Sequence, residues 1–218
     1  TREWKTSRFK KPWLPGETIS IAIGQGYNTV TPLQLALAYG ALANGGTVWR
    51  PRVVRQIEAI DGQVVQTFAP EKKGALPLNE KNRVLLRDAL WGVVNEGGGT
   101  GYAARRKEAD VAGKTGTAQV VGLPAEGKVR SLSGRCRDHA LFVCFAPHKQ
   151  PEIVVAVIAE NAGHGGSAAA PVARQVIDAY FAQKSKAAKE QVNRLDPPSR
   201  SAQAPGTTAA QPVRREDP

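Results

Sequence analysis

The sequence has no methionine, two cysteines and few aromatic residues, which make up 6% of its 218 positions. No apolar run approaches the roughly 18 residues of a membrane-spanning helix, so we expect no transmembrane segment within it. The first residues, Thr1 to Lys5, are polar and do not read as a signal peptide. A start without methionine, in a chain that has none at all, leads us to expect a piece of a longer protein. The length suits one domain with a real core.

The charge balance is strongly basic, with 30 Lys and Arg against 19 Asp and Glu and a formal net charge of +11. Such a surplus suits an anionic partner such as nucleic acid, anionic lipid or an acidic polymer. The basic residues are scattered and no aromatic residues alternate with them, which disfavours nucleic acid. An anionic-surface binder stays open as one function class, beside the simpler explanation of a soluble surface and a basic tail.

The most unusual stretch starts at residue 113 and reads GKTGTAQVV. Glycine weakens a strand unless something must approach its backbone closely. In a regular strand, Lys114 and Gly116 lie on one face and Thr115, Thr117 and Gln119 on the other. An edge strand of this composition can pair with an extended peptide and hold a carboxylate with its cation and hydroxyls.

Two other interpretations of this stretch compete. The letters imitate the end of a phosphate-binding loop, but that motif needs a glycine where the chain has Glu108, and a helix should follow instead of a strand. An ordinary turn that leads into a core strand fits these residues equally well when they are taken alone.

Cysteine and histidine spacing raises the question of a metal site. Cys136, His139, Cys144 and His148 have the spacing of a small zinc knuckle. Residues 139–146 read as one strand, however, which would point His139 and Cys144 to opposite faces. We therefore expect buried free thiols and no metal.

The first 20 residues are basic, aromatic and broken by prolines, so we predict an irregular loop. They contain a formal S-x-x-K at Ser7 and Lys10. In serine acyl-enzymes this motif starts a buried helix. Because Lys11-Pro12 follows at once and disfavours helical geometry, we interpret Ser7 as a non-catalytic serine.

The remaining patterns predict an α+β fold, an antiparallel sheet with packing helices. Thr31, Pro32 and Gln34 form a capping box for a buried helix that runs through Ala43. A hairpin over 52–68 turns at Asp61-Gly62, and a helix over 79–95 starts at Asn79. Strands at 114–121, 139–146 and 152–160 form an antiparallel meander, the last two fully buried. A last helix covers 169–182, and a disordered basic, Pro- and Ala-rich tail covers 183–218.

Six stretches, in this order, resemble the class B penicillin-binding proteins. They read RFKKPW from residue 8, IGQGY from 23, TPLQ from 31, GKTGTAQ from 113, HALFVCFAP from 139 and GHGGSAAAP from 163. The fourth stretch looks like the third motif of the penicillin-recognising serine transferases. The likeness covers about residues 1–182 and is greatest to the elongation-type peptidoglycan D,D-transpeptidases. It implies the C-terminal part of a penicillin-binding, β-lactamase-like transpeptidase domain.

The chain departs from that family in two motifs. The family has a nucleophilic serine in S-x-x-K and a second motif, S-x-N or S-x-D, before the stretch at residue 23. Ser7 is not in a credible setting, and no S-x-N or S-x-D triplet occurs. We therefore expect the chain to carry the K-T-G strand without the nucleophile, to be inactive alone, and to aggregate through an unpaired sheet edge.

The resemblance also implies site residues. Lys114 and Thr117 would be catalytic, Lys114 through its charge and Thr117 through a backbone N–H that stabilises the oxyanion. Lys114, Thr115, Gly116, Thr117 and Gln119 would bind substrate, with both threonine hydroxyls on its carboxylate. The resemblance implies no cofactor. Four further residues would pack beside the cleft, and these are Trp13, Tyr27, Tyr102 and His164.

For the parent protein the resemblance implies a serine enzyme that cross-links peptidoglycan stem peptides during cell-wall elongation. β-Lactams would acylate it because they mimic the D-Ala-D-Ala end. Implied partners are a glycan polymerase and an elongation complex, and the implied location is the periplasmic face of the bacterial inner membrane, with an N-terminal anchor. The alternative is a non-catalytic module that binds peptidoglycan or a partner protein.

Overall fold

A computed structural model describes residues 1–108, 110–121 and 134–195 of the protein. The chain divides into two compact units, Thr1–Tyr180 and Phe181–Pro218. No helix in the described ranges is long and apolar enough to cross a membrane. The first unit contains the sheet that carries the K-T-G stretch.

Three antiparallel strands form this sheet in the order β5-β6-β7, which confirms the predicted meander. β5 covers Ala112–Ala118, β6 covers His139–Ala146 and β7 covers Ile153–Ala159. The central strand β6 is buried as expected, with Phe142 and Phe145 fully inaccessible. The expectation of a fully buried third strand was wrong, since Ile158 is 44% exposed. β7 has a strand on one edge only, so its side chains are less well covered.

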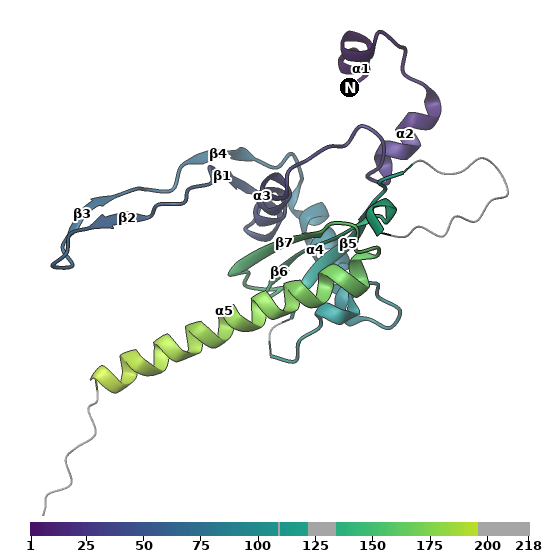
Figure 1. The fold of residues 1–218 in the computed structure, drawn as a ribbon. Helices are drawn as coiled ribbons and strands as arrows, with labels where there is room; N and C mark the ends of the chain where they lie inside the picture. Colours follow the sequence, from purple (N-terminus) through teal and green to yellow (C-terminus); the bar gives the residue numbers. More distant parts are fainter. Residues whose placement is uncertain (109, 122–133, 196–218) are drawn as a thin grey trace, which may run out of the picture. The chain divides into compact units, whose positions relative to one another are not determined.

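Two predicted helices pack against the sheet. α3, Pro32–Ala43, starts at the predicted Thr31 capping box, and α4, Glu80–Asn95, starts at Asn79. α3 contacts β6 and β7, whereas α4 contacts β5. Figure 1 shows α4 behind the sheet and the first turns of α5 in front of it. The prediction that α3 is buried throughout was wrong: its last residues are buried, but Leu33 is 57% exposed because no described element covers the first turn.

The N-terminal residues are helical, which corrects the predicted irregular loop. α1 covers Arg2–Phe9 and α2 covers Pro15–Ala22. The buried Lys5 ammonium donates hydrogen bonds to the Glu17 carboxylate and to the Pro12 carbonyl, which ties the two helices together. Glu17 also accepts from the Leu14 N–H and so caps α2, and these bonds hold its pKa below the usual range. The prolines therefore separate two short helices without preventing them.

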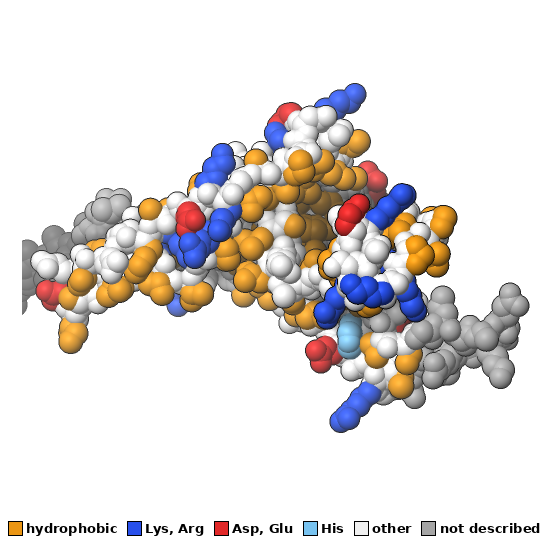
Figure 2. Space-filling model, turned by 90° about the horizontal axis from the view of Figure 1, so that it is seen from above, with side chains coloured by type: hydrophobic (Ala, Val, Ile, Leu, Met, Phe, Trp, Pro, Cys, Tyr) orange, Lys and Arg blue, Asp and Glu red, His pale blue; other side chains and the backbone are white. Residues whose placement is uncertain are grey.

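Residues 47–75 form two successive antiparallel strand pairs. β1, Thr47–Trp49, pairs with β4, Lys72–Ala75, and β2, Gln56–Glu58, pairs with β3, Val64–Thr67. The predicted hairpin is confirmed, but its turn has three residues, because Ala59 N–H donates to the Gln63 carbonyl. Many apolar side chains of Thr1–Tyr180 are exposed. Figure 2 shows hydrophobic side chains spread over the face seen there.

The last helix, α5, covers Gly165–Leu195 and is longer than the predicted 169–182. Among its described apolar side chains, those of Ala169, Ala170, Ala173 and Ile177 are fully buried. Beyond Ala182 the sequence continues with lysine, alanine, glutamine and glutamate, which favour helix, and the next proline is Pro197. Two short 3-10 turns complete the fold, η1 at Tyr102–Ala104 and η2 at Gly134–Cys136. Residues 196–218 of the predicted tail lie outside the described residues.

We predict that Gly113→Ala destabilises the domain by about 1–3 kcal/mol, a typical cost of overpacking. An added Cβ would lie 2.6 Å from both Cys144 Cβ and the Val143 carbonyl oxygen, and backbone cannot move aside cheaply. Chemical denaturation measures the effect. Gly74→Ala is the matched control, because a Cβ there has nothing within 4 Å. Equal stability of the two variants would contradict the packing around β5.

Candidate active site

The K-T-G stretch lies on an edge strand with one edge open. β6 pairs along one edge of β5, and no described strand pairs along the other. Gln25 Nε2 donates to the Thr117 carbonyl oxygen at 3.2 Å, so this backbone group points away from β6. Because backbone groups alternate between the two edges of a strand, the N–H and C=O groups of Thr115 and Thr117 face the open edge.

A cavity of about 630 Å³ lies at this edge. Lys114, Thr115, Gly116 and Thr117 line it, so the structure brings together four of the five predicted substrate-binding residues. Gln119 is exposed beyond the end of β5 and does not line the cavity. Five residues from two other segments complete the lining, and these are Thr100, His164, Gly165, Gly166 and Ser167.

The polar groups of the cavity suit a carboxylate. Lys114 Nζ donates to the Thr115 carbonyl oxygen at 2.9 Å and approaches Thr115 Oγ1 at 3.4 Å. Thr115 Oγ1 lies 2.9 Å from Thr100 Oγ1. No ion pair involves Lys114 in the described ranges, so its charge is available to an anion. A cation beside hydroxyls binds carboxylates through charge-assisted hydrogen bonds.

The first turn of α5 closes another side of the cavity. A Cβ on Gly165 would lie 2.1 Å from the Leu141 carbonyl oxygen, and one on Gly166 would lie 2.4 Å from the Thr100 carbonyl oxygen. Only glycine therefore allows the helix to begin this close to β5 and to the loop that precedes η1. The free N–H groups and partial positive charge of a helix N-terminus add to the attraction for an anion.

Comparison with known proteins is consistent with this geometry. Residues 4–178 match the family described as the penicillin binding protein transpeptidase domain. The chain belongs to this family. It is 44% identical over 194 residues to the peptidoglycan D,D-transpeptidase MrdA of Haemophilus influenzae and 40% identical over 184 residues to MrdA of Escherichia coli. The chain covers 29% and 28% of those proteins, which in turn align with 84% and 82% of it.

Solved structures give the same family. Pseudomonas aeruginosa PBP2, crystallised with WCK 5153, superposes with a TM-score of 0.64 at 39% identity, over 83% of this chain and 36% of that one. Penicillin-binding protein A of Mycobacterium tuberculosis superposes with a TM-score of 0.59 at 27% identity, over 74% and 33%. The α+β fold expected from the sequence is thus the transpeptidase fold of penicillin-binding proteins.

Two residues at this edge of the transpeptidase domain were not predicted from the sequence. Thr100 lines the cavity, and Gln25 donates a hydrogen bond to the Thr117 carbonyl oxygen. Glycines on both sides of each residue were the available signal, because they allow close backbone approach. His164 lines the cavity, whereas Trp13 and Tyr27 pack in an aromatic cluster and Tyr102 lines a different cavity.

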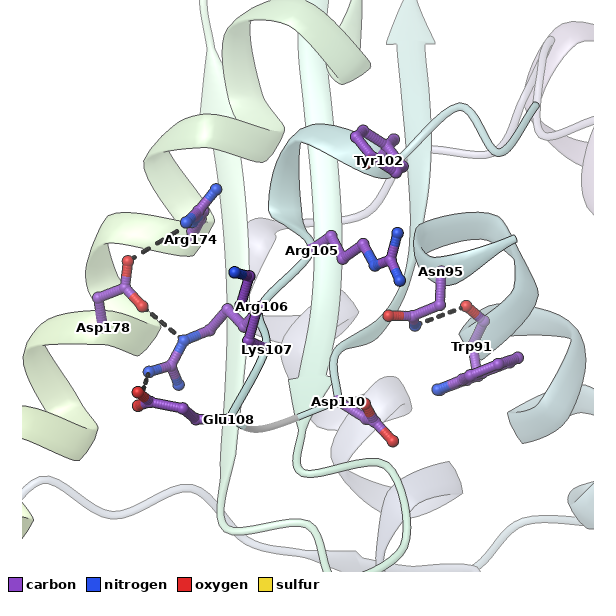
Figure 3. Close-up of a pocket in the computed structure, with 10 residues that line it drawn as sticks. All are labelled: Trp91, Asn95, Tyr102, Arg105, Arg106, Lys107, Glu108, Asp110, Arg174 and Asp178. Carbon is purple, nitrogen blue, oxygen red and sulfur yellow. Dashed lines mark hydrogen bonds and ion pairs between the residues drawn. The ribbon is translucent and has the colours of Figure 1, made fainter. Parts of the chain in front are cut away.

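A second cavity of the transpeptidase domain, of about 740 Å³, is larger but carries a structural ion-pair network (Figure 3). Arg106 pairs with Asp178 of α5 at 2.5 Å and with Glu108 at 4.0 Å, and Arg174 pairs with Asp178 at 3.6 Å. The network links the segment after η1 to α5. Because these charges largely neutralise one another, we assign the cavity a role in packing.

The four residues that have the spacing of a zinc knuckle do not form a cluster in the structure. The expectation of buried free thiols is confirmed for Cys144, in β6, and was wrong for Cys136, which is free but exposed in η2. His139 Nδ1 accepts a hydrogen bond from the Asn161 N–H at 2.9 Å, and His148 lies 3.1 Å from Asp88. Throughout the described residues, no three His, Cys, Asp or Glu side chains are grouped to hold a metal.

We predict that one thiol reacts with a soluble disulfide reagent at pH 8 and that both react in denaturant. Burial raises the pKa of Cys144 from 9.0 to about 12, which keeps it protonated as well as inaccessible. Cys136→Ser should remove the fast reaction. Since the unfolded thiol ionises near pH 9, Cys144 also makes folding less favourable as the pH rises from 9 toward 12. Two fast thiols in the native protein would contradict the structure.

Proposed function

We propose that this chain forms the oxyanion and substrate-carboxylate side of a serine-type peptidoglycan D,D-transpeptidase of cell-wall elongation. The single observation that carries the proposal is the open edge of β5, where Lys114, Thr115 and Thr117 meet in one cavity. The MrdA relatives support it, because they are peptidoglycan D,D-transpeptidases. The chain spans less than a third of their length, so the serine nucleophile is proposed to lie in the rest of the full-length protein.

Substrate binding follows from the strand edge. An extended stem peptide lies along the open edge of β5, as extended peptides add to other sheet edges. In the structure, the carbonyl oxygens of Thr115 and Thr117 accept hydrogen bonds from Lys114 and Gln25, and the N–H groups of both threonines face the open edge. Its terminal carboxylate meets Lys114 Nζ and the two threonine hydroxyls. The partial positive charge at the N-terminus of α5 also attracts this carboxylate. Gly116 has no side chain, so the peptide can approach the backbone of β5 closely at this position.

The chemistry proceeds in two acyl transfers. The serine oxygen bonds to the carbonyl carbon of the penultimate D-Ala, the C–N bond breaks, and the serine proton passes through a basic group to the departing D-Ala amine. The nitrogen of an amine on a second stem then bonds to the ester carbon, the C–O bond to the serine breaks, and an amine proton passes to the serine oxygen, which completes the cross-link. In both steps the negative oxygen accepts a hydrogen bond from the Thr117 N–H, which the open edge presents.

Partners and location are proposed on the same basis. A solved complex of PBP2 with MreC from Helicobacter pylori is among the structural neighbours, at 27% identity and a TM-score of 0.57. We propose elongation-complex partners, a glycan polymerase among them, and a membrane-anchored parent at the periplasmic face. β-Lactams are proposed as covalent inhibitors. The exposed apolar side chains, Leu33 and Ile23 among them, support burial against further parts of the full-length protein.

Incubation with a fluorescent penicillin tests the proposal. The full-length protein should form a covalent adduct that survives denaturing electrophoresis, and the 218-residue chain should form none. Intact mass and peptide mapping then locate the acylated serine. A full-length protein that binds stem peptides without forming an adduct would indicate the non-catalytic module instead. An adduct on Ser7 of the isolated chain would overturn the assignment of the nucleophile.

We predict that Lys114→Gln lowers acylation of the full-length protein about 10- to 100-fold, because a hydrogen bond to a charged group contributes about 1.5–3 kcal/mol. Stopped-flow acylation by a penicillin measures the loss. Lys72→Gln removes the same charge from the exposed strand β4 and should leave the rate unchanged. If both variants lose activity equally, general electrostatics and not the cavity would explain the effect.

A further inference from the structure

The loop between α4 and η1 brings the hydroxyl of another threonine, Thr100, to the K-T-G strand. Thr100 Oγ1 lies 2.9 Å from Thr115 Oγ1. Thr100 lines the cavity although its loop precedes β5 by more than ten residues. The Thr100 hydroxyl contacts one of the groups proposed to bind the substrate carboxylate.

Close packing fixes the position of Thr100. Gly101 N–H donates to the Val93 carbonyl at 3.0 Å, and a Cβ on Gly99 would lie 2.3 Å from the same oxygen. On the other side, a Cβ on Gly166 would lie 2.4 Å from the Thr100 carbonyl oxygen. The loop is therefore held between the end of α4 and the start of α5, and Thr100 has little freedom to retreat from Thr115.

The available donors and acceptors give the direction of the hydrogen bond between Thr100 and Thr115 when substrate is bound. A hydroxyl has one proton to donate and two lone pairs to accept, whereas a carboxylate only accepts. Thr115 can donate to the carboxylate only if its proton turns away from Thr100. Thr100 must then donate to Thr115 Oγ1, and Lys114 Nζ, 3.4 Å away, faces the same oxygen. The two neighbours fill the lone pairs of Thr115 and leave its proton for the ligand.

We propose that Thr100 is a positioning residue that makes the site selective for a free carboxylate at the end of the donor peptide. This inference rests on the proposed function. Thr100 donates to Thr115, and Thr115 donates to the carboxylate, so each bond polarises and strengthens the next. A terminal carboxamide carries no charge and gains less from the same chain, because hydrogen bonds to ionised groups are the stronger ones.

Two thioester donors test the selectivity in the full-length protein. Both are N-acetyl-D-alanyl thioesters, one of thioglycolate and one of its carboxamide, so only the terminal charge differs. In each acylation the serine oxygen bonds to the acyl carbon, the C–S bond breaks, and the serine proton leaves with the thiol. The readout is the ratio of kcat/KM for the acid donor to that for the amide donor.

Thr100→Val, which keeps the shape and loses the hydroxyl, should lower this ratio about fivefold, as expected for the loss of one ordinary hydrogen bond. Thr100→Ser should keep the ratio within about twofold, on the same scale. In a Thr115→Val background, Thr100→Val should change the ratio no further, because the hydroxyl that Thr100 orients is absent. Thermal unfolding of each variant confirms that it is folded.

Two results would overturn the inference. One is an unchanged ratio in Thr100→Val, and an equal loss on both donors, which indicates packing alone, is a case of it. The other is an undiminished effect of Thr100→Val in the Thr115→Val background. Failure of the proposed function looks different, because wild-type protein would then form no acyl-enzyme with either donor. Wild-type acylation without any preference for the acid donor would count against the inference and not against the transpeptidase assignment.

Discussion

The unpaired edge of β5 is the feature on which the site depends. An open edge normally invites association with other strands. Here the Gln25 side chain, the loop that carries Thr100 and the first turn of α5 surround it, so a defined cavity remains. In the function that we propose, the same edge supplies the Thr117 N–H for an oxyanion and the Lys114 charge for a carboxylate. The groups that cover this edge therefore also shape the proposed binding site.

Rigidity behind the edge keeps these groups in place. β6 is buried along nearly its whole length, and Gly113 lets it approach β5 so closely that a Cβ would collide with backbone. Gly165 and Gly166 allow the helix N-terminus to touch the strand from another side. Preorganised dipoles of this kind stabilise developing charge without reorganising during the reaction. The small residues of the site therefore set its geometry, and the polar ones supply its chemistry.

Features encoded by neighbouring residues were predictable from the sequence. The caps at Thr31 and Asn79, the hairpin and the three-stranded meander all follow from local hydrogen bonding and periodicity, and the K-T-G residues were found from their composition. Contacts between distant segments were not predictable: the glycines beside Gln25 and Thr100 signal a close backbone approach, but nothing local identifies the partner, which is 92 or 15 residues away. α1 and α2 were missed for the same reason: the Lys5–Glu17 pair joins them across the connection that contains Pro12.

A crystal structure of the full-length protein acylated by a penicillin tests this account most directly. The account predicts the acyl carbonyl oxygen within about 3 Å of the Thr117 backbone N–H, an ordinary hydrogen-bond distance. It also predicts the penicillin carboxylate beside Thr115 Oγ1 and Lys114 Nζ. A carboxylate bound away from β5, with Thr117 N–H facing no ligand atom, would contradict the central claim that the open edge of this strand binds and activates the substrate.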